Sequence, residues 1–378
     1  MKRKTIRVLH LLLGLISGVV VFVVAVTGCL LVFEEEISRF CNYGTYRSVA
    51  RDGASIAPPS KLFSNTDSLL AGREIKRAYS ITYLQDELLS TVWSLDRAGQ
   101  YHATPLHPQT GQSIGAFDYP HSFFAIVLDL HMHLAMGEVG ASIVGYATAI
   151  FVLLMITGLL LWKPANRKGY KQRFRIKWNA SGKRLTYDLH NVLGFYMSWV
   201  AIFIAITGLV WSFAWVDQSL QWLANGGKTI AYTEREYRSD TTGYETVLLQ
   251  EQRRQLVMDS LFATHLQAAH RINALEVHRP MSAAAPLYIA VQTMRGANYA
   301  RTDYYSYDSY TGKLLGQELF ADMSNGEKLR RLNYYIHMGS IAGLTGKLAA
   351  FFASLIAASL PITGLLIYIN RGKRKRKP

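Results

Sequence analysis

The sequence predicts a membrane α-helical fold, in which four transmembrane helices come from a duplicated two-helix unit and two α+β domains lie outside the bilayer. Three observations predict it. Half of the 378 residues are hydrophobic, and many of them form long apolar stretches. The net charge of +15 is concentrated in a few short segments, and the pattern of the first half of the chain recurs in the second.

Four apolar stretches correspond to the predicted membrane helices. Each has about the 20 residues that an α-helix needs to cross the hydrocarbon core of a bilayer. The first is too long for the core of a signal peptide and lacks a small-residue cleavage site, so we expect it to remain as an anchor. The stretches span residues 8–33, 142–162, 192–215 and 348–369.

The basic residues predict the orientation of these helices. Lys and Arg crowd the segment before the first helix, the loop after the second and the tail after the fourth. By the positive-inside rule these segments are cytoplasmic, so both termini lie inside and the two long connections are periplasmic, as in a bacterial inner-membrane protein. The excess positive charge therefore indicates topology and contact with membrane lipid, and no nucleic-acid partner is expected.

An internal repeat relates the two halves of the chain. The same spacing separates a histidine from a Thr-Gly pair in helices one and three, and a second common spacing does so in helices two and four. The outer segments also repeat a Thr-Gly turn, preceded by alternating runs at 90–95 and 286–291 that predict strands. The matched elements are His10 to Thr27-Gly28 and His190 to Thr207-Gly208, His131 to Thr157-Gly158 and His337 to Thr363-Gly364, and the turns Thr110-Gly111 and Thr311-Gly312.

These features divide the chain into eight segments. Each outer segment is expected to form a small α+β domain, with a helix at 256–270 in the second. The predicted order is transmembrane helix 1 (1–33), outer domain 1 (34–130), an interfacial segment with helix 2 (131–162), a cytoplasmic loop (163–187), helix 3 (188–215), outer domain 2 (216–336), an interfacial segment with helix 4 (337–370) and a cytoplasmic tail (371–378).

Four repeated histidines are the candidate site residues, because ionisable groups in membrane helices are costly and usually functional. The topology places His10 and His190 at the cytoplasmic level and His131 and His337 at the periplasmic level. A neutral imidazole is a good axial ligand for haem iron, and histidines of two facing helices can hold one porphyrin. The pattern therefore predicts two bis-histidine haem sites. No C-x-x-C-H motif occurs, so the haem would be held non-covalently, as haem b.

Other interpretations stay open at this point. Each histidine could instead lie at the membrane rim, and zinc is disfavoured because a structural zinc site gathers four ligands. His131 and His133 lie about 200° apart on a helix, so only one of them can face a given porphyrin. The repeat favours His131 and leaves His133 as the alternative ligand or a second contact.

The distance between the two sites depends on a break after the periplasmic histidines. A straight helix from His337 to Asn370 would be about 50 Å long and would carry His337 far outside the membrane. Glycines after each histidine permit an interruption or a flat interfacial segment. They are Gly137, Gly140 and Gly145 in the first half and Gly339, Gly343 and Gly346 in the second.

Four motifs carry a resemblance to a known family. They are Leu9-His10-x-x-x-Gly14, Leu189-His190-x-x-x-Gly194, Leu130-His131 with the later Gly158-Leu159-Leu160-Leu161-Trp162, and the run 304–312. In these motifs the chain resembles the PepSY-associated transmembrane family, which includes FoxB-like siderophore-iron reductases, and the run 304–312 is similar to a PepSY strand and turn. The resemblance implies PepSY-like periplasmic domains, b-type haem in the membrane and a ferric siderophore as substrate. One departure is His107, which stands in the first PepSY turn where the second has Asp308.

Two functions are compatible with this pattern. The first is a haem-dependent ferric-siderophore reductase that passes electrons from the cytoplasmic side to the periplasm and releases Fe(II), with no catalytic residues beyond the haem irons. Because the chain has no dinucleotide fingerprint, the donor would be a separate cytoplasmic or quinol-type molecule. The alternative is a non-redox PepSY scaffold or a siderophore transport component. A chelate-binding surface could be formed by Tyr304, Tyr305, Tyr307, Tyr310, Arg279, Arg295 and Arg301. The alternating tyrosines are also typical of ordinary residues of a β-sheet.

Overall fold

The structure is a computed structural model, and it divides the chain into two compact units. The membrane unit comprises residues 1–34, 126–228 and 329–378, and the sheet unit comprises 35–125 and 229–328. Each unit is described by itself. The described residues are 3–41, 56–71, 75–84, 90–96, 101–114, 121–164, 170–230, 236–244, 246–268, 272–294 and 299–375.

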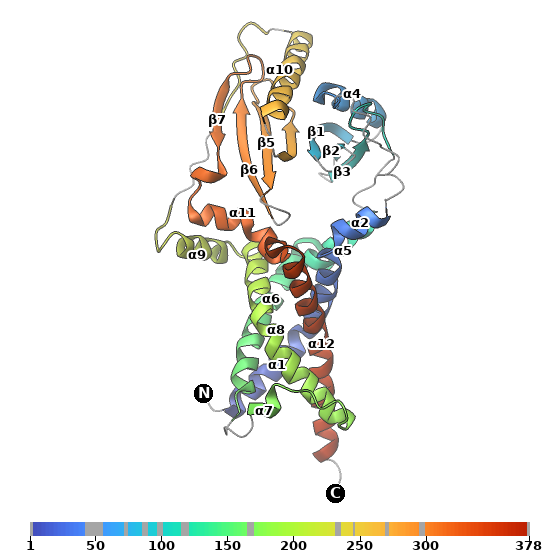
Figure 1. The fold of residues 1–378 in the computed structure, drawn as a ribbon, viewed down its shortest axis with the longest axis vertical. Helices are drawn as coiled ribbons and strands as arrows, with labels where there is room; N and C mark the ends of the chain where they lie inside the picture. Colours follow the sequence, from blue (N-terminus) through green and yellow to red (C-terminus); the bar gives the residue numbers. More distant parts are fainter. Residues whose placement is uncertain are drawn as a thin grey trace. The chain divides into compact units, whose positions relative to one another are not determined.

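Four long apolar helices form the membrane unit (Figure 1). They are α1 (Arg3–Leu31), α6 (Gly137–Trp162), α8 (Gly182–Ser212) and α12 (Gly343–Lys375). Each exceeds the roughly 20 residues required to cross a bilayer, and α1 begins at the end of the bundle where α12 ends. Shorter helices of this unit are α5 (Phe123–His133), α7 (Tyr170–Arg173), α9 (Ala214–Ala224) and α11 (Asn325–His337). The helix α2 (Glu34–Cys41) follows α1 and lies almost entirely in the residues of the sheet unit.

The four helices pack in a ring, in which α1 and α8 each contact both α6 and α12. Small residues dominate the buried interior of this bundle. Ala25, Ala201, Ala353 and Ala357 are buried there beside larger side chains such as Met155. Small side chains allow helix backbones to approach closely, which is how membrane helices gain packing energy without a hydrophobic driving force between them.

Both predicted interruptions are present. After α5 ends at His133, Leu134 and Ala135 adopt positive φ angles of 52° and 56°, and α6 begins at Gly137. A Cβ added to Gly140 would overlap the carbonyl oxygen of His133, so this tight turn requires glycine.

The second interruption follows α11, which ends at His337. Gly339 and Gly343 have φ angles of 74° and 64° and flank the short 3-10 helix Ser340–Ala342. A Cβ added to Gly346 would overlap the carbonyl oxygen of Gly339. Each half of the chain therefore turns sharply between a histidine at a helix end and the next membrane helix.

The described residues of the sheet unit form a seven-stranded antiparallel sheet in the order β3-β2-β1-β4-β5-β6-β7. The sequence predicts two separate α+β domains, but strands of both segments join in this sheet because β1 pairs with β4, with Ile81 opposite Val277. This pairing satisfies two strand edges that would otherwise be open. The strands are β1 (Ile75–Leu84), β2 (Ser90–Asp96), β3 (Tyr101–Leu106), β4 (Ile272–His278), β5 (Leu287–Met294), β6 (Ala300–Tyr307) and β7 (Leu314–Glu318).

Two helices, one from each segment, pack on this sheet and on each other (Figure 1). They are α4 (Pro59–Leu70) and α10 (Val247–Ala268). Phe63 and Phe262 from these helices share one core with Ile81, Val277 and Ile289 of the sheet. The 3-10 helix Phe320–Asp322 follows β7. The sheet unit is thus a single two-layer α+β structure.

The two repeated turns are built alike although their key residues differ. In the second segment Asp308 Oδ1 accepts hydrogen bonds from the backbone N–H groups of Tyr310 and Thr311, at 3.0 and 2.8 Å. In the first segment His107 Nδ1 accepts from the N–H groups of Gln109 and Thr110, at 3.2 and 3.4 Å. The imidazole of His107 therefore replaces the carboxylate as the turn acceptor.

Candidate functional site: two histidine pairs in the helix bundle

The structure brings His10 of α1 and His190 of α8 together near the end of the bundle where α1 begins. Their ring centroids are 6.5 Å apart and the ring planes are nearly perpendicular, at 88°. We call these two residues the first pair. Both histidines lie within long, continuous membrane helices.

The structure brings His131 of α5 and His337 of α11 together in the same way. Their centroids are 6.3 Å apart with an interplanar angle of 71°. This second pair lies in the last turns of two short helices, because His337 ends α11 and His131 is two residues before the end of α5. Each pair thus joins one histidine of the first half of the chain to one of the second half.

A threonine of a neighbouring helix holds each histidine. In all four cases the imidazole Nδ1 lies within hydrogen-bond distance of a threonine Oγ1, and the threonine belongs to a Thr-Gly pair of the same half of the chain. The sequence shows these Thr-Gly pairs as repeat markers, and only the structure reveals their contact with the histidines. The distances are His10–Thr157 2.9 Å, His190–Thr363 2.9 Å, His131–Thr27 3.0 Å and His337–Thr207 3.0 Å.

The glycine that follows each threonine provides the space for the ring. A Cβ added at Gly28 or Gly208 would lie 3.3 Å from the Cε1 atom of His131 or His337, closer than ordinary van der Waals contact. The corresponding distances are 3.5 Å from Gly158 to His10 and 3.4 Å from Gly364 to His190. By contrast, a Cβ at Gly14 would meet only Leu154, at 3.9 Å. In each of the four Thr-Gly pairs, the threonine therefore contacts the imidazole Nδ1 and the glycine leaves space for the ring.

The geometry of both pairs fits two axial ligands of one iron atom. A metal–imidazole nitrogen bond is about 2.0 Å long, so two imidazoles on opposite sides of one metal have centroids roughly 6 Å apart. Both pairs match that separation. Among the hydrogen bonds of the described residues, those of the four histidines involve Nδ1 and none involves Nε2. These hydrogen bonds leave Nε2 as the nitrogen of each histidine that could bind a metal such as haem iron.

His133 joins neither pair. Its Nδ1 atom lies 3.0 Å from Asp129 Oδ1, one helical turn earlier on α5, and its side chain is 38% exposed. Within the described part of the chain, no three His, Cys, Asp or Glu residues gather in a group that could hold a metal ion. The two bis-histidine pairs are therefore the candidate metal-binding groups of the membrane unit.

The two pairs lie at different depths of the bundle. His10 and Thr27, which contacts His131, lie on the same helix 17 residues apart. At about 1.5 Å per residue, this places the two pairs about 25 Å apart along the helix axis. That distance is close to the thickness of the hydrocarbon core, about 30 Å.

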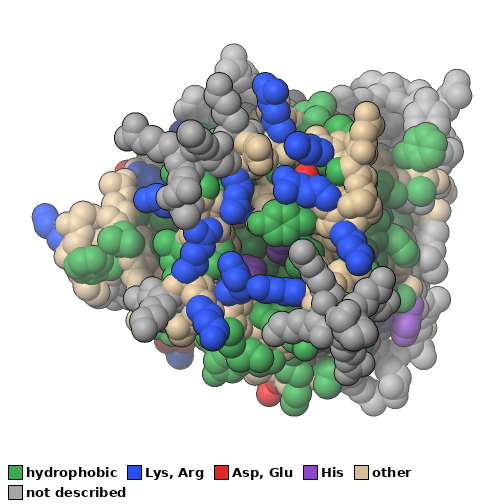
Figure 2. All heavy atoms as spheres, turned by 90° about the horizontal axis from the view of Figure 1, so that it is seen from below, with side chains coloured by type: hydrophobic (Ala, Val, Ile, Leu, Met, Phe, Trp, Pro, Cys, Tyr) green, Lys and Arg blue, Asp and Glu red, His purple; other side chains and the backbone are tan. Residues whose placement is uncertain are grey.

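Cationic side chains surround the bundle end nearest the first pair. Figure 2 shows Lys and Arg side chains gathered on this face, with histidine side chains visible between them. Arg3 Nη2 donates to the carbonyl oxygens of Leu161 and Lys163, at 2.9 and 3.0 Å, and so ties α1 to α6. The buried Asp188 carboxylate, two residues before His190, accepts from Arg184 Nε at 2.9 Å.

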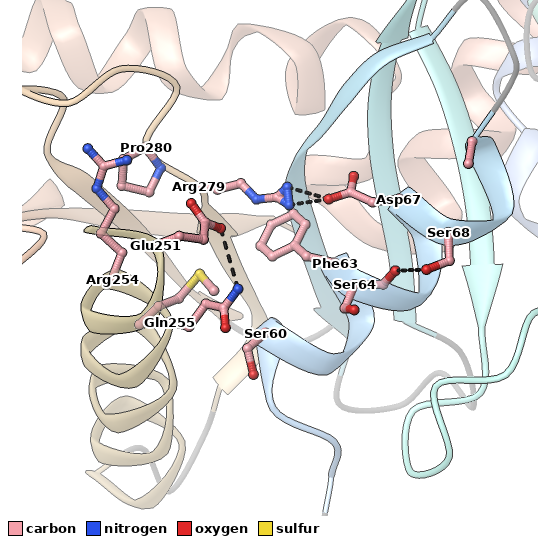
Figure 3. A pocket seen from close by; sticks show the side chains of 12 residues that line it. Ser60, Phe63, Ser64, Asp67, Ser68, Glu251, Arg254, Gln255, Arg279 and Pro280 are labelled. Carbon is pink, nitrogen blue, oxygen red and sulfur yellow. Dashed lines mark hydrogen bonds and ion pairs between the residues drawn. The ribbon is translucent and has the colours of Figure 1, made fainter. Parts of the chain in front are cut away.

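The sheet unit contains a pocket of about 370 Å³ between α4 and α10 (Figure 3). Its charged groups are bound by the protein itself. Arg279 Nη1 donates to Asp67 Oδ2 at 2.7 Å, with the guanidinium 4.5 Å above the Phe63 ring. Arg254 Nη2 donates to the carbonyl oxygens of Ser282 and Ala283, at 2.8 and 2.7 Å. The Arg279–Asp67 contact connects the two segments of the sheet unit, whereas the contacts of Arg254 lie within the second segment.

The tyrosine and arginine residues that the sequence groups together do not form one surface. Tyr310 is fully buried, where it stacks on Tyr244 and donates to the carbonyl oxygen of Ala283 within the second segment. Arg279 is 8% exposed and is bound by Asp67 of the first segment. Tyr307 Oη hydrogen-bonds to His265 Nε2 at 2.8 Å, and burial raises the pKa of Tyr307 and lowers that of His265. Arg295 lies outside the described residues.

A comparison with protein families identifies the chain. A search among curated proteins finds no match. The family described as PepSY-associated TM region matches residues 7–371, which include all four membrane helices and both histidine pairs. Because the match covers nearly the whole chain, this membrane protein belongs to the PepSY-associated transmembrane family.

Proposed function

We propose that this protein is a membrane oxidoreductase that binds two b-type haems and reduces ferric siderophores. The observation that carries the proposal is the pair of bis-histidine groups, each with a centroid separation suited to one iron atom. His10 and His190 would bind one haem, and His131 and His337 the other. Bound haem supplies one-electron redox chemistry, because its iron alternates between Fe(II) and Fe(III).

The protein's own residues contribute position and enclosure. The threonine contacts orient the imidazoles, and the glycines leave room for them. Buried apolar side chains such as Ala25, Met155 and Ala201 fill the bundle interior and would keep water out of it. The separation of about 25 Å along the axis extends over most of the bilayer core. This arrangement supports electron transfer from one membrane face to the other.

The proposed direction follows from charge. The basic segments at the end nearest the first pair would be cytoplasmic by the positive-inside rule, with the sheet unit in the periplasm of a bacterial inner membrane. A cytoplasmic or quinol-type donor would supply the electrons. One electron reduces the Fe(III) of a bound siderophore to Fe(II), which hard oxygen ligands hold less tightly. The siderophore substrate rests on the resemblance to FoxB-like reductases.

A non-redox scaffold is the second candidate function. Its supporting observation is the single sheet shared by both outer segments, because a continuous seven-stranded platform can present a binding surface without any redox centre. The scaffold function gives no reason for four histidines to meet in two pairs. We therefore favour the reductase.

An absorption spectrum of the protein purified in detergent separates the two functions. We expect a Soret band whose α and β bands sharpen with dithionite, and two haems per chain by the pyridine haemochrome assay. The reduced protein should then be reoxidised by a ferric siderophore, with Fe(II) trapped by ferrozine. A protein that stays colourless after expression and reconstitution with haemin would refute the redox function and favour the scaffold.

A further inference from the structure

We infer that the four threonines of the Thr-Gly pairs are positioning residues, which fix each histidine as the tautomer that carries its proton on Nδ1. The inference deepens the proposed function and rests on it, because a haem ligand needs an unprotonated nitrogen directed at the iron. It concerns Thr157 and Thr363, which hold the first pair, and Thr27 and Thr207, which hold the second.

The argument begins with the single proton of a threonine hydroxyl. Each of these hydroxyls also lies within hydrogen-bond distance of the carbonyl oxygen four residues earlier on its own helix. A carbonyl can only accept, so the hydroxyl proton is directed there. The distances are 2.8 Å from Thr157 to Leu153, 2.9 Å from Thr363 to Ser359, 2.8 Å from Thr27 to Val23 and 2.9 Å from Thr207 to Phe203.

The hydroxyl oxygen is then left as an acceptor for the imidazole. The only proton available for the contact of 2.9 to 3.0 Å is the one on histidine Nδ1. A neutral imidazole protonated on Nδ1 has its lone pair on Nε2. The hydrogen bond that a threonine makes to its own helix therefore determines which nitrogen of the neighbouring histidine is free to bind a metal.

The second pair supports this assignment independently. His131 Nδ1 lies 3.0 Å from the carbonyl oxygen of Val24, and His337 Nδ1 lies 3.0 Å from that of Ile204. Since a carbonyl cannot donate, both Nδ1 atoms must carry a proton. Two acceptors thus face each Nδ1 of the second pair.

A hydrogen-bond acceptor on Nδ1–H also makes the imidazole a stronger electron donor. Stronger donation stabilises Fe(III) relative to Fe(II), so the threonines should lower the midpoint potential of the haem. Removing Thr157 should therefore raise the potential of the first site. Removing Thr27 should have a smaller effect on the second site, because the Val24 carbonyl remains as an acceptor for His131.

The experiment compares Thr157→Val, Thr27→Val and a control, Thr148→Val, by redox titration and electron paramagnetic resonance of the haem-loaded protein. Thr148 makes the same bond to its own helix, to Val144 at 2.8 Å, and among the described residues it is hydrogen-bonded to no histidine. We expect a positive shift and altered g values for Thr157→Val, a smaller shift for Thr27→Val and none for the control. Thr157→Ser, which retains the hydroxyl, should restore the wild-type values.

A second measurement does not need haem. In protein labelled with ¹⁵N-histidine and prepared without haem, the nitrogen chemical shifts distinguish the Nδ1–H and Nε2–H tautomers. We expect Nδ1–H signals in the wild type that change in Thr157→Val but not in Thr148→Val. A wild type in which these histidines are Nε2–H, or unchanged potentials in both threonine variants, would overturn the inference while leaving haem binding intact. Absence of haem in the wild type would refute the proposed function, and the tautomer signals would still decide the inference.

Discussion

The two histidine pairs have the same ring separation but stand on different backbones. His10 and His190 belong to helices of 29 and 31 residues that continue past them in both directions. His131 and His337 are at the ends of helices of 11 and 13 residues, and sharp glycine-dependent turns follow. The backbone of the first pair is therefore positioned by the packing of continuous helices, whereas that of the second also depends on two turns.

The difference reflects a structural requirement on each half of the chain, which must bring a histidine to each end of the helix bundle. A long helix can present one histidine near its first turns and one Thr-Gly pair near its last, as α1 and α8 do. The chain must then return a second histidine to that Thr-Gly pair, and an uninterrupted helix from His131 or His337 would project away from it. A break in the helix after the histidine lets the histidine reach the Thr-Gly pair while the next helix still crosses the membrane. Both halves of the chain have such a break.

The largest expected effect is that replacing one histidine of a pair removes the haem of that pair and leaves the haem of the other pair in place. His190→Ala should leave one haem per chain and retain the spectrum of the second site, and His337→Ala should do the reverse, because each removes one of two axial ligands. Pyridine haemochrome content and low-temperature spectra measure this. His133→Ala is the matched control and should retain both haems. If His190→Ala and His337→Ala removed the same spectral component, the pairing would be wrong.

The turns provide the next test. Gly140→Ala places a Cβ on the carbonyl oxygen of His133 and should displace α5. We expect a loss of stability of about 3 kcal/mol, at the upper end for overpacking, together with haem loss confined to the second site. Gly14→Ala is the control, since its Cβ meets only Leu154 at 3.9 Å. Thermal unfolding followed at the Soret band measures both changes. Equal loss of both haems would remove the distinction between the two pairs.

A smaller effect on stability and haem occupancy is expected at the glycines that contact the imidazole rings. An added methyl lies 3.3 Å from His131 in Gly28→Ala but 3.5 Å from His10 in Gly158→Ala. The first should cost about 1 kcal/mol and lower haem occupancy at the second site. The second should be close to neutral. Haem retention during dialysis against apomyoglobin compares the two variants, and a greater loss in Gly158→Ala would contradict the ranking.

The smallest expected effect is a pH dependence of the stability of the sheet unit, which should leave the two histidine pairs unchanged. Burial lowers the pKa of His265 below 6.5, so the folded sheet unit binds this proton less readily than the unfolded chain does. The stability of the sheet unit is therefore complete above pH 6.5 and falls as the pH decreases from there towards the lowered pKa. His265→Gln should weaken this decline in thermal unfolding measured from pH 7.5 to 5. A steeper decline in the variant would contradict the assignment.

Sequence patterns were sufficient for features that depend on local composition. Four apolar stretches of membrane length predict four membrane helices, and the structure has α1, α6, α8 and α12 there. The glycines after His131 and His337 predict interruptions, and both occur. Such features follow from the chain's own hydrophobicity and backbone freedom, so neighbouring residues in the sequence contain the information.

Contacts between distant segments required the tertiary structure. Sequence register favours His131 over His133 but cannot show which ring faces His337, because the answer depends on how α5 and α11 approach one another. The threonines were visible only as repeat markers until the fold placed Thr27 against His131, 104 residues away. The pairing of β1 with β4, which unites two predicted domains in one sheet, is likewise a choice between strand edges far apart in the chain. The sequence alone therefore determined the four membrane helices and the four repeated histidines. The tertiary structure decided which histidines pair and which threonines they contact, because these contacts depend on how distant segments pack in space.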